Sequence, residues 1–355
     1  MLYRESGQFK TSYKADMAIF PIRQDLWGVI MTLIVAVVIV PAFASEHMIV
    51  GYLLPFMIWS IAAIGLNILT GYAGQLSLGH GAFMAVGAYS AYNLAVRIPD
   101  LPLLAVFIGA GLIAAACGVV VGSPSLRIKG FYLAVATLAA QFFSEWVFAT
   151  FPWFVGGAAS MVIDTPKMSL FGYPIESNLD NYFLVLGFVI VTTLLAKNLV
   201  RSAIGRAWMA VRDMDVAAEV IGIRPLYTKL SAFAVSSFFA GIAGALYAFC
   251  YVKSVDFTAF DLFVSLKVLF MIIIGGMGSI LGCFLGAAFI VILPILLNVA
   301  AHHLTGGQVS PELITNIEHM TFGGLIVYFL IVEPHGLARM WTTAKEKLRL
   351  WPFPH

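Results

Sequence analysis

Long apolar runs are the feature that most constrains the fold of this chain. Residues 27–44, 182–196 and 319–332 are each almost free of charged side chains. A helix of about 20 apolar residues crosses the roughly 30 Å hydrocarbon core of a bilayer, and it satisfies its own backbone hydrogen bonds there. The chain is 61% hydrophobic and 11% charged, whereas a soluble domain carries about 25% charged residues. We therefore expect an all-α, polytopic membrane protein.

The apolar pattern predicts about ten transmembrane helices, at 27–44, 49–69, 76–94, 103–122, 130–151, 181–197, 230–251, 263–281, 283–300 and 319–333. Basic residues indicate their orientation, because cytoplasmic loops carry the excess of Lys and Arg. Sixteen of the 20 basic residues fall in four segments, at 1–26, 123–129, 197–229 and 334–355. Ten spans place all four segments on one side, so both termini are predicted to be cytoplasmic.

This topology divides the chain into a cytoplasmic segment at 1–26, a transmembrane domain at 27–333 and a basic cytoplasmic tail at 334–355. The largest outward piece, at 152–180, is expected to form a short cap with turns and a small helix. The largest inward piece, at 198–229, has apolar residues at helical spacing. The tail is basic and contains tryptophans, which is typical of a helix at the headgroup surface.

Two glycine-rich segments interrupt the apolar runs, at Gly71–Gly81 and Gly275–Gly286. Glycine permits close helix contacts and also helix breaks. A break at membrane depth is tolerated only inside protein or beside a water-filled path, and in transporters such breaks mark the substrate path. Two interpretations of these segments stay open. The glycines serve helix packing alone, or they also permit a broken or re-entrant segment beside the path. The candidates for a translocation path are Asn67, Gly74, Gln75, Ser77, His80, Glu145, Lys267, Gly275 and Gly276.

Lys267 is unusual, because a lysine inside a span costs about 2.5–3.5 kcal/mol on insertion scales. It lies about four residues, or roughly 6 Å along a helix, from the outer end of its expected span. Three interpretations stay open. The side chain extends to the headgroups, it pairs with Glu145 in the outer half of another span, or it contacts an anionic substrate.

Several kinds of chemistry are not indicated. The sequence has no Gly-x-x-x-x-Gly-Lys-Ser/Thr phosphate loop, no cluster at metal-ligand spacing and no suggestion of a serine–histidine–acid arrangement. We therefore expect a chain that is not an enzyme and holds no cofactor of its own. The basic residues follow the topology and form no patch, so no nucleic acid is expected as a partner.

A short motif lies in the inward segment. Ala217-Ala218-x-x-x-Gly222 resembles the Glu-Ala-Ala-x-x-x-Gly loop of ABC importer permeases, with Val216 in place of the glutamate. A short helix with small residues on one face fits a groove of a partner, and flanking charges set its register. An ordinary amphipathic surface helix is the alternative. The coupling candidates are Gly205, Arg206, Trp208, Arg212, Asp213, Ala217, Ala218, Glu219 and Gly222.

Longer blocks resemble one family, the branched-chain amino-acid type of ABC importer permease, and within it the longer of the two permease types. The similar blocks follow the family order from about residue 50 to 338, at 65–83, 86–89, 124–138, 204–212, 240–247, 274–279 and 333–337. One outward segment departs from the family pattern: Val155-Gly-Gly-Ala-Ala-Ser160 stands where the family often has Thr-Gly-Gly-x-x-Gly.

The resemblance implies a bacterial inner-membrane importer. Its partners would be a homologous second permease, two cytoplasmic ATPase subunits that use ATP and Mg, and a soluble extracytoplasmic binding protein. ATPase closure would then move the inward helix and switch the spans between outward and inward access. Branched-chain and other hydrophobic amino acids are the expected cargo, and urea, amides or aromatic acids are the alternatives. A stand-alone transporter or channel would need charged residues at mid-depth in several spans, which this sequence lacks.

Overall fold

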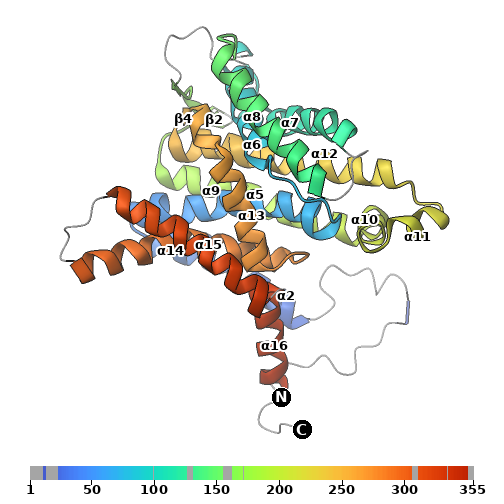
Figure 1. The fold of residues 1–355 in the computed structure, drawn as a ribbon. Coiled ribbons are helices and arrows are strands. Elements are labelled where there is room, and N and C mark those ends of the chain that lie inside the picture. Colours follow the sequence, from blue (N-terminus) through green and yellow to red (C-terminus); the bar gives the residue numbers. More distant parts are fainter. Residues whose placement is uncertain are drawn as a thin grey trace.

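The computed structural model describes residues 11–12, 23–98, 100–125, 131–154, 162–170, 172–305, 311–333 and 335–350. Within these residues the chain is an assembly of long helices with four very short strands, as Figure 1 shows. The predicted all-α polytopic class is confirmed. Four features of the sequence lie largely or wholly outside the described residues: the segment at 1–26, the basic loop at 126–130, the departure at Val155–Ser160 and the residues at 351–355.

The first half of the chain begins with two nearly continuous helical stretches. The first stretch joins α2 (Arg23–Ile34), a π-helical turn (Val35–Ile39) and α3 (Val40–Phe43). The second joins α4 (Glu46–Met48), a π-helical turn (Ile49–Leu53), α5 (Leu54–Asn67) and a π-helical turn, η3 (Ile68–Tyr72). The helices that follow are α6 (His80–Arg97), α7 (Leu103–Ser125) and α8 (Phe131–Thr150).

The second half begins with α9 (Asn178–Arg201), whose start is closed by a capping box between Ser177 and Asp180. The remaining helices are α10 (Ala203–Asp213), α11 (Asp215–Val220), α12 (Pro225–Leu246) with the π-helical turn η4 (Tyr247–Val252), the 3₁₀ turn η5 (Phe257–Phe260), α13 (Leu262–Gly275), α14 (Ile280–Thr305), α15 (Pro311–Val332) and α16 (Gly336–Leu350).

In the described residues, eight helices are long and apolar enough to cross a membrane. A ninth candidate joins His319–Val332 and Gly336–Lys347 across a 49° bend. The expected span at 76–94 is not among them. Helix α6 starts only at His80, and although it has 18 residues, it is not apolar enough to qualify. The expected span at 263–281 lies earlier in the chain than predicted, since the candidate runs from Phe257 to Gly275.

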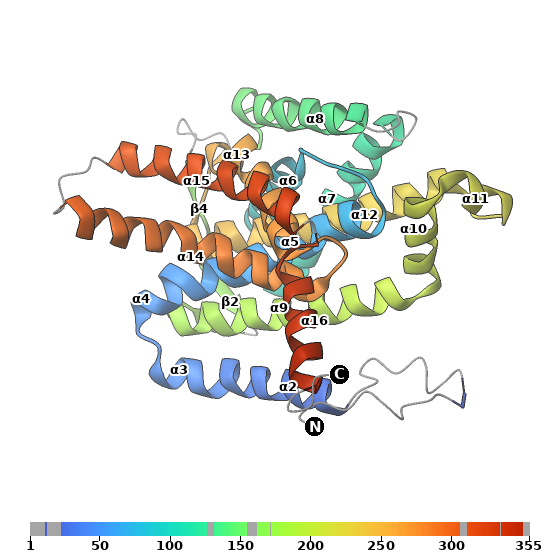
Figure 2. The same cartoon turned by 60° about the horizontal axis from the view of Figure 1, so that its bottom comes forward.

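Helix α12 lies at the centre of the molecule and packs against α5, α6 and α7, as the second view shows (Figure 2). Small residues make these contacts close. A Cβ at Gly87 of α6 would overlap the carbonyl of Gly241, and one at Gly244 would overlap the carbonyl of Met84. Close backbone approach through small residues is the usual way in which membrane helices associate. Both α5 and α12 are therefore buried along most of their length.

The outward cap contains short strands where turns and a small helix were expected. Strand β1 (Ile163–Asp164) pairs antiparallel with β4 (Ser254–Val255), and β2 (Met168–Leu170) pairs antiparallel with β3 (Tyr173–Ile175). The first pair ties the cap to the end of α12, and Lys253 there has a left-handed φ of 61°. In the described part of the cap, the chain therefore uses strand pairing to fasten the loop.

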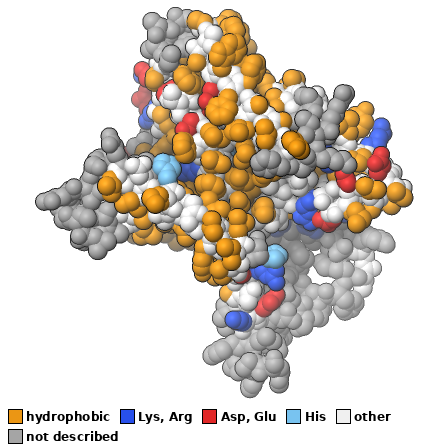
Figure 3. All heavy atoms as spheres, viewed as in Figure 1, with side chains coloured by type: hydrophobic (Ala, Val, Ile, Leu, Met, Phe, Trp, Pro, Cys, Tyr) orange, Lys and Arg blue, Asp and Glu red, His pale blue; other side chains and the backbone are white. Residues whose placement is uncertain are grey.

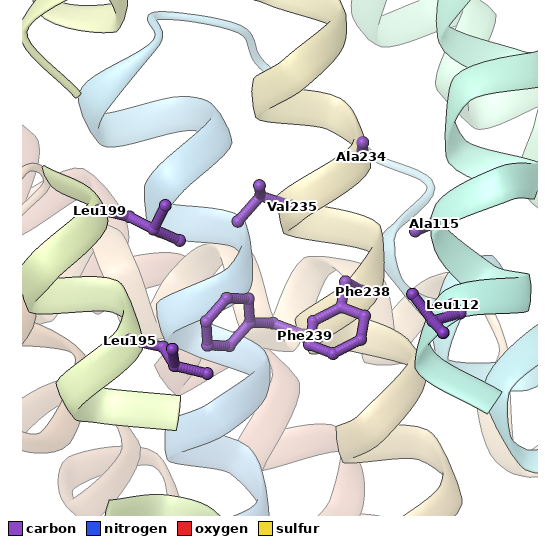
Figure 4. Close-up of a pocket in the computed structure, with 8 residues that line it drawn as sticks. All are labelled: Leu112, Ala115, Leu195, Leu199, Ala234, Val235, Phe238 and Phe239. Carbon is purple, nitrogen blue, oxygen red and sulfur yellow. The ribbon is translucent and has the colours of Figure 1, made fainter. Parts of the chain in front are cut away.

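The face shown in Figure 3 is rich in apolar side chains where the structure describes it, with charged groups gathered at a few places. A wholly apolar cavity of about 310 Å³ lies between α7, α9 and α12, and its lining residues are Leu112, Ala115, Leu195, Leu199, Ala234, Val235, Phe238 and Phe239 (Figure 4). The start of α2 and helix α16 lie near each other in both ribbon views (Figures 1 and 2). The cytoplasmic side for both termini stays a prediction.

Candidate coupling and translocation elements

The first glycine-rich segment is a true break in the helical structure. The helix that includes α5 ends at Tyr72, the chain continues without regular structure through 73–79, and α6 begins at His80. The start of α6 lies beside the middle of the preceding helix, because His80 Nε2 is 3.0 Å from the carbonyl oxygen of Ala62. This part of the chain is therefore irregular inside the protein, the setting in which a membrane protein tolerates a broken helix.

Side chains from two other helices satisfy the first amide groups of α6. The first N–H groups of any helix have no partner within the helix, and the N-cap residue here is Gly79, which offers no side chain. Gly81 N donates to Ser265 Oγ at 2.7 Å, and Ala82 N donates to Gln141 Oε1 at 2.7 Å. Just before the helix, Leu78 N donates to Thr137 Oγ1 at 2.9 Å. The break is thus held by α8 and α13.

Gln141 is the centre of this buried network. Its Oε1 also accepts from Ser265 Oγ at 3.0 Å, and its Nε2 donates to the Phe260 carbonyl at 2.7 Å and to Glu145 Oε1 at 2.9 Å. Glu145, a predicted path residue, is therefore joined to the start of α6. Sequence reasoning missed Gln141, Ser265 and Thr137. The spacing of four between Thr137, Gln141 and Glu145 puts three polar groups on one face of α8 and was the available signal.

The other path candidates of this segment are mostly buried. His80 is completely buried, and its Nε2 must donate to Ala62 because a carbonyl only accepts. Ser77 is also completely buried, and its Oγ accepts from Gly79 N. Gln75 is 3% exposed, and its side-chain amide has no hydrogen-bond partner in the described structure. Gly74 is exposed and has a positive φ of 69°, a conformation that favours glycine.

Lys267 lies on α13 with its ammonium group near an aromatic ring. Its Nζ is 5.2 Å from the centroid of the Trp59 ring, within the range of a cation–π interaction. Trp59 in turn lies against Tyr247, with ring centroids 5.5 Å apart. Lys267 therefore has an aromatic neighbour that none of its three interpretations included. The three interpretations themselves stay predictions.

The second glycine-rich segment is a tight turn between α13 and α14. Its backbone conformation depends on glycine, since φ is 111° at Gly276 and 78° at Gly278. Ser279 closes the start of α14, because its Oγ accepts from Gly282 N at 3.1 Å. Gly275 lies so close to the next helix that a Cβ there would overlap the carbonyl of Gly282. Here glycine serves both the turn and the helix contact.

Asn67 joins the two glycine-rich segments. Its Oδ1 accepts from Gly278 N at 2.8 Å, and its Nδ2 donates to the Ser279 carbonyl at 3.1 Å. Gly71 lies directly beside this contact, because a Cβ on it would overlap both Asn67 Oδ1 and Gly278 N. Two segments about 200 residues apart in sequence therefore form one packed unit at the end of α5.

Arg212 connects α10, which lies in the segment predicted to face inward, to the same unit. Its Nη1 donates to the Gly71 carbonyl at 2.8 Å, while its Nε and Nη2 contact Asp213 Oδ1, each at 2.8 Å. We call Asn67, Gly71, Arg212 and Gly278 the glycine junction. Sequence reasoning placed Asn67 among the path candidates and Arg212 among the coupling candidates, and the structure brings these two groups together.

Helix α10 is firmly anchored in the described structure. Ser202 caps its start by accepting from Ile204 N, and Gly205 packs so closely on the end of α9 that a Cβ would overlap the Val200 carbonyl. Trp208 is completely buried, and its Nε1 donates to Ser231 Oγ of α12 at 2.9 Å. The side chain of Arg206 is instead exposed to solvent, and it donates to the Arg201 carbonyl. Helix α10 is therefore fastened to both α9 and α12.

The following helix α11 presents an apolar patch. Ala218 is buried, whereas Ala217, Glu219 and Gly222 are exposed. Gly222 has a φ of 92°, which ends this stretch as predicted, and α12 begins at Pro225. The exposed apolar patch of α11 consists of Met214, Val216, Val220 and Ile221, which are 65%, 64%, 84% and 73% exposed. A group of exposed apolar side chains on a short helix with charged neighbours is typical of an interaction surface.

These features define a polytopic membrane protein with a broken helix inside and a short exposed helix pair connected to that break. The family described as branched-chain amino acid transport system / permease component matches residues 48–330, so the chain belongs to this family. It is accordingly a multi-pass permease subunit of an ABC importer in the bacterial inner membrane, as its apolar helices and its relatives together indicate.

Curated relatives cover most of the chain. It is 32% identical over 321 residues to the high-affinity branched-chain amino acid transport system permease protein LivM of Escherichia coli (strain K12), covering 82% of this chain and 70% of that protein. The LivM protein of Salmonella typhimurium has the same identity and coverage. The probable branched-chain amino acid transport permease protein LivM of Methanocaldococcus jannaschii is 25% identical over 327 residues, covering 80% and 91%. No solved structure matches the chain.

Proposed function

We propose that this chain forms half of a translocation path for branched-chain and other hydrophobic amino acids. A homologous second permease would supply the other half, and an extracytoplasmic binding protein would deliver the cargo. Two cytoplasmic ATPase subunits would supply the energy by using ATP and Mg, while this chain binds no cofactor and catalyses no reaction. The observation that carries the proposal is the family match over residues 48–330, together with relatives that are named for branched-chain amino acid transport.

The exposed patch of α11 is the surface that we assign to an ATPase subunit. Met214, Val216 and Val220 lie beside charged groups of the same region, including Asp213 and Glu219. An apolar centre with a charged rim is the usual composition of a specific protein interface. Because α10 is anchored on α9 and α12, a force applied at α11 would reach the membrane helices without being lost in a loose loop.

Uptake by the reconstituted complex tests the transport function. The chain would be co-expressed with its second permease, ATPases and binding protein, placed in proteoliposomes and supplied with labelled leucine, isoleucine and valine. We expect uptake that requires ATP and is stimulated by the binding protein. An ATPase that cannot hydrolyse ATP is the control. Uptake of urea, an amide or an aromatic acid in place of leucine would reject the proposed cargo, and uptake without the ATPases would reject the ABC mechanism.

A charge placed in the α11 patch tests the docking surface. Val220→Asp should weaken co-purification of the ATPase subunits by about tenfold or more, because a carboxylate would enter an apolar contact. Val162→Asp is the matched control, since Val162 is also exposed but lies in the outward cap. Equal loss in both variants, or none in either, would place the ATPase contact elsewhere.

A further inference from the structure

We propose that Arg212 is the positioning residue that transmits movement of α10 and α11 to both glycine-rich segments, by holding the backbone carbonyl of Gly71 at the glycine junction. The inference rests on the proposed function, because it assumes that an ATPase moves α11. It goes beyond that function by naming the atoms through which the movement enters the membrane domain.

The charge and geometry of Arg212 suit this role. The Gly71 carbonyl belongs to η3, the last turn of the helix that includes α5, where carbonyl groups lack partners within the helix and carry partial negative charge. A guanidinium is always charged and offers its donors in a rigid fork. Arg212 uses one side of that fork for Asp213 on its own helix and the other for Gly71. Its side chain is therefore fixed relative to α10 while it binds the membrane domain.

Close packing at the junction leaves little room for independent movement. A Cβ at Gly74 would lie 2.7 Å from Arg212 Cγ, so the chain that leads to α6 is pressed against the same side chain. On the other side, Gly71 is pressed against Asn67 and Gly278. Packed elements of this kind change between discrete arrangements and do not deform gradually. A displacement of Arg212 must therefore shift the backbone at 71–74, and through Asn67 the turn at 276–279.

Transport measured per ATP hydrolysed tests this role. In the assembled complex we expect Arg212→Gln to keep basal ATPase activity but to lose much of its stimulation by the binding protein, while the amount of cargo moved per ATP falls on the order of tenfold, within the usual range of a coupling free energy. Arg212→Lys keeps the charge and one donor, and should recover part of the loss. Arg224→Gln is the matched control, because Arg224 lies over the Tyr227 ring on the same side of the molecule and should leave the ratio unchanged.

Hydrogen exchange of the wild-type complex provides a measurement that does not depend on a variant. Exchange would be compared without nucleotide and with ATP held by an ATPase that cannot hydrolyse it. We expect changes in peptides that cover α10–α11, 67–79 and 276–279. In Arg212→Gln the change should persist in α10–α11 and disappear from the other two peptides.

The possible results separate the inference from the function on which it rests. If the wild-type complex shows no uptake driven by ATP, the proposed function fails. If it does transport and Arg212→Gln moves as much cargo per ATP as wild type, the role of Arg212 is wrong. Should Arg212→Gln fail to assemble, the wild-type exchange decides: a response in α10–α11 without one at 67–79 would overturn the proposal, and a response in all three peptides would support it.

Discussion

Seven irregular residues, 73–79, separate two helices in the first glycine-rich segment, whereas in the second the chain reverses within four, 276–279. The difference lies in how each following helix begins. Helix α14 is capped by its own Ser279, while α6 depends on Gln141 and Ser265 from other helices. A helix with a local cap is stable where the chain turns. A helix whose first amide groups are capped by side chains of other helices is stable only while those helices stay in place. This dependence suits an element that must move.

The largest effect is expected from Gly286→Ala in the second segment. A Cβ there would overlap the Met271 carbonyl, so α13 and α14 would have to separate. Overpacking typically costs about 1–3 kcal/mol, and we expect the cost to be well above this range here, because the atoms that must move belong to the backbone. Thermal unfolding of the purified protein in detergent should show a clear loss of stability. Gly187→Ala is the control, since nothing lies within 4 Å of its Cβ position, and an equal loss there would contradict the packing argument.

The next effect is expected from Gln141→Leu, which removes one of the two caps that α6 receives from other helices. The Ala82 amide and the Phe260 carbonyl would lose their buried partner, at about 1–3 kcal/mol for each unsatisfied group. Uptake should fall together with thermal stability. Ser144→Ala serves as the control on the same helix, because its hydroxyl only contacts the local Gln141 carbonyl. Normal stability in Gln141→Leu would show that α6 starts without help from α8.

Asn67→Ala tests whether the two segments depend on each other. The change removes partners of the Gly278 amide and the Ser279 carbonyl, with an expected cost of about 2 kcal/mol. Hydrogen exchange of the backbone amides should become faster at 276–279 and also at 67–79. The exposed Asn316→Ala on α15 should change neither segment. An increase confined to one segment would mean that the segments act independently.

The smallest effect is expected from Ser279→Ala, which removes the local cap of α14. Loss of an N-cap side chain costs about 1 kcal/mol, and the first turn of α14 should exchange faster. The start of α6 should be unaffected, because its caps come from Gln141 and Ser265. Faster exchange at α6 in this variant would contradict the distinction between a local cap and caps from other helices.

Much of the fold was predictable from apolar length and from local breakers. The spans near α2, α7, α9 and α12 follow from their apolar runs. The expected span at 76–94 was only partly right. A helix does form there, but it begins only at His80 and is less apolar than the other spans. A pattern of residue types also does not reveal that Thr137 and Gln141 support an irregular backbone before His80. The strands of the outward cap escaped prediction because each has only two or three residues.

The sequence alone determined that this chain is a helical membrane protein, because its apolar runs are long enough to cross lipid as helices, which satisfy their own backbone hydrogen bonds there. It also marked the family, the two glycine-rich segments and the inward helix. Only the tertiary structure decided how these parts meet. Asn67, Arg212 and Gly278 come from three distant parts of the chain, and a contact between them depends on how whole helices pack. Apolar length is a local property, whereas the partner of a polar group inside the protein is set by the fold.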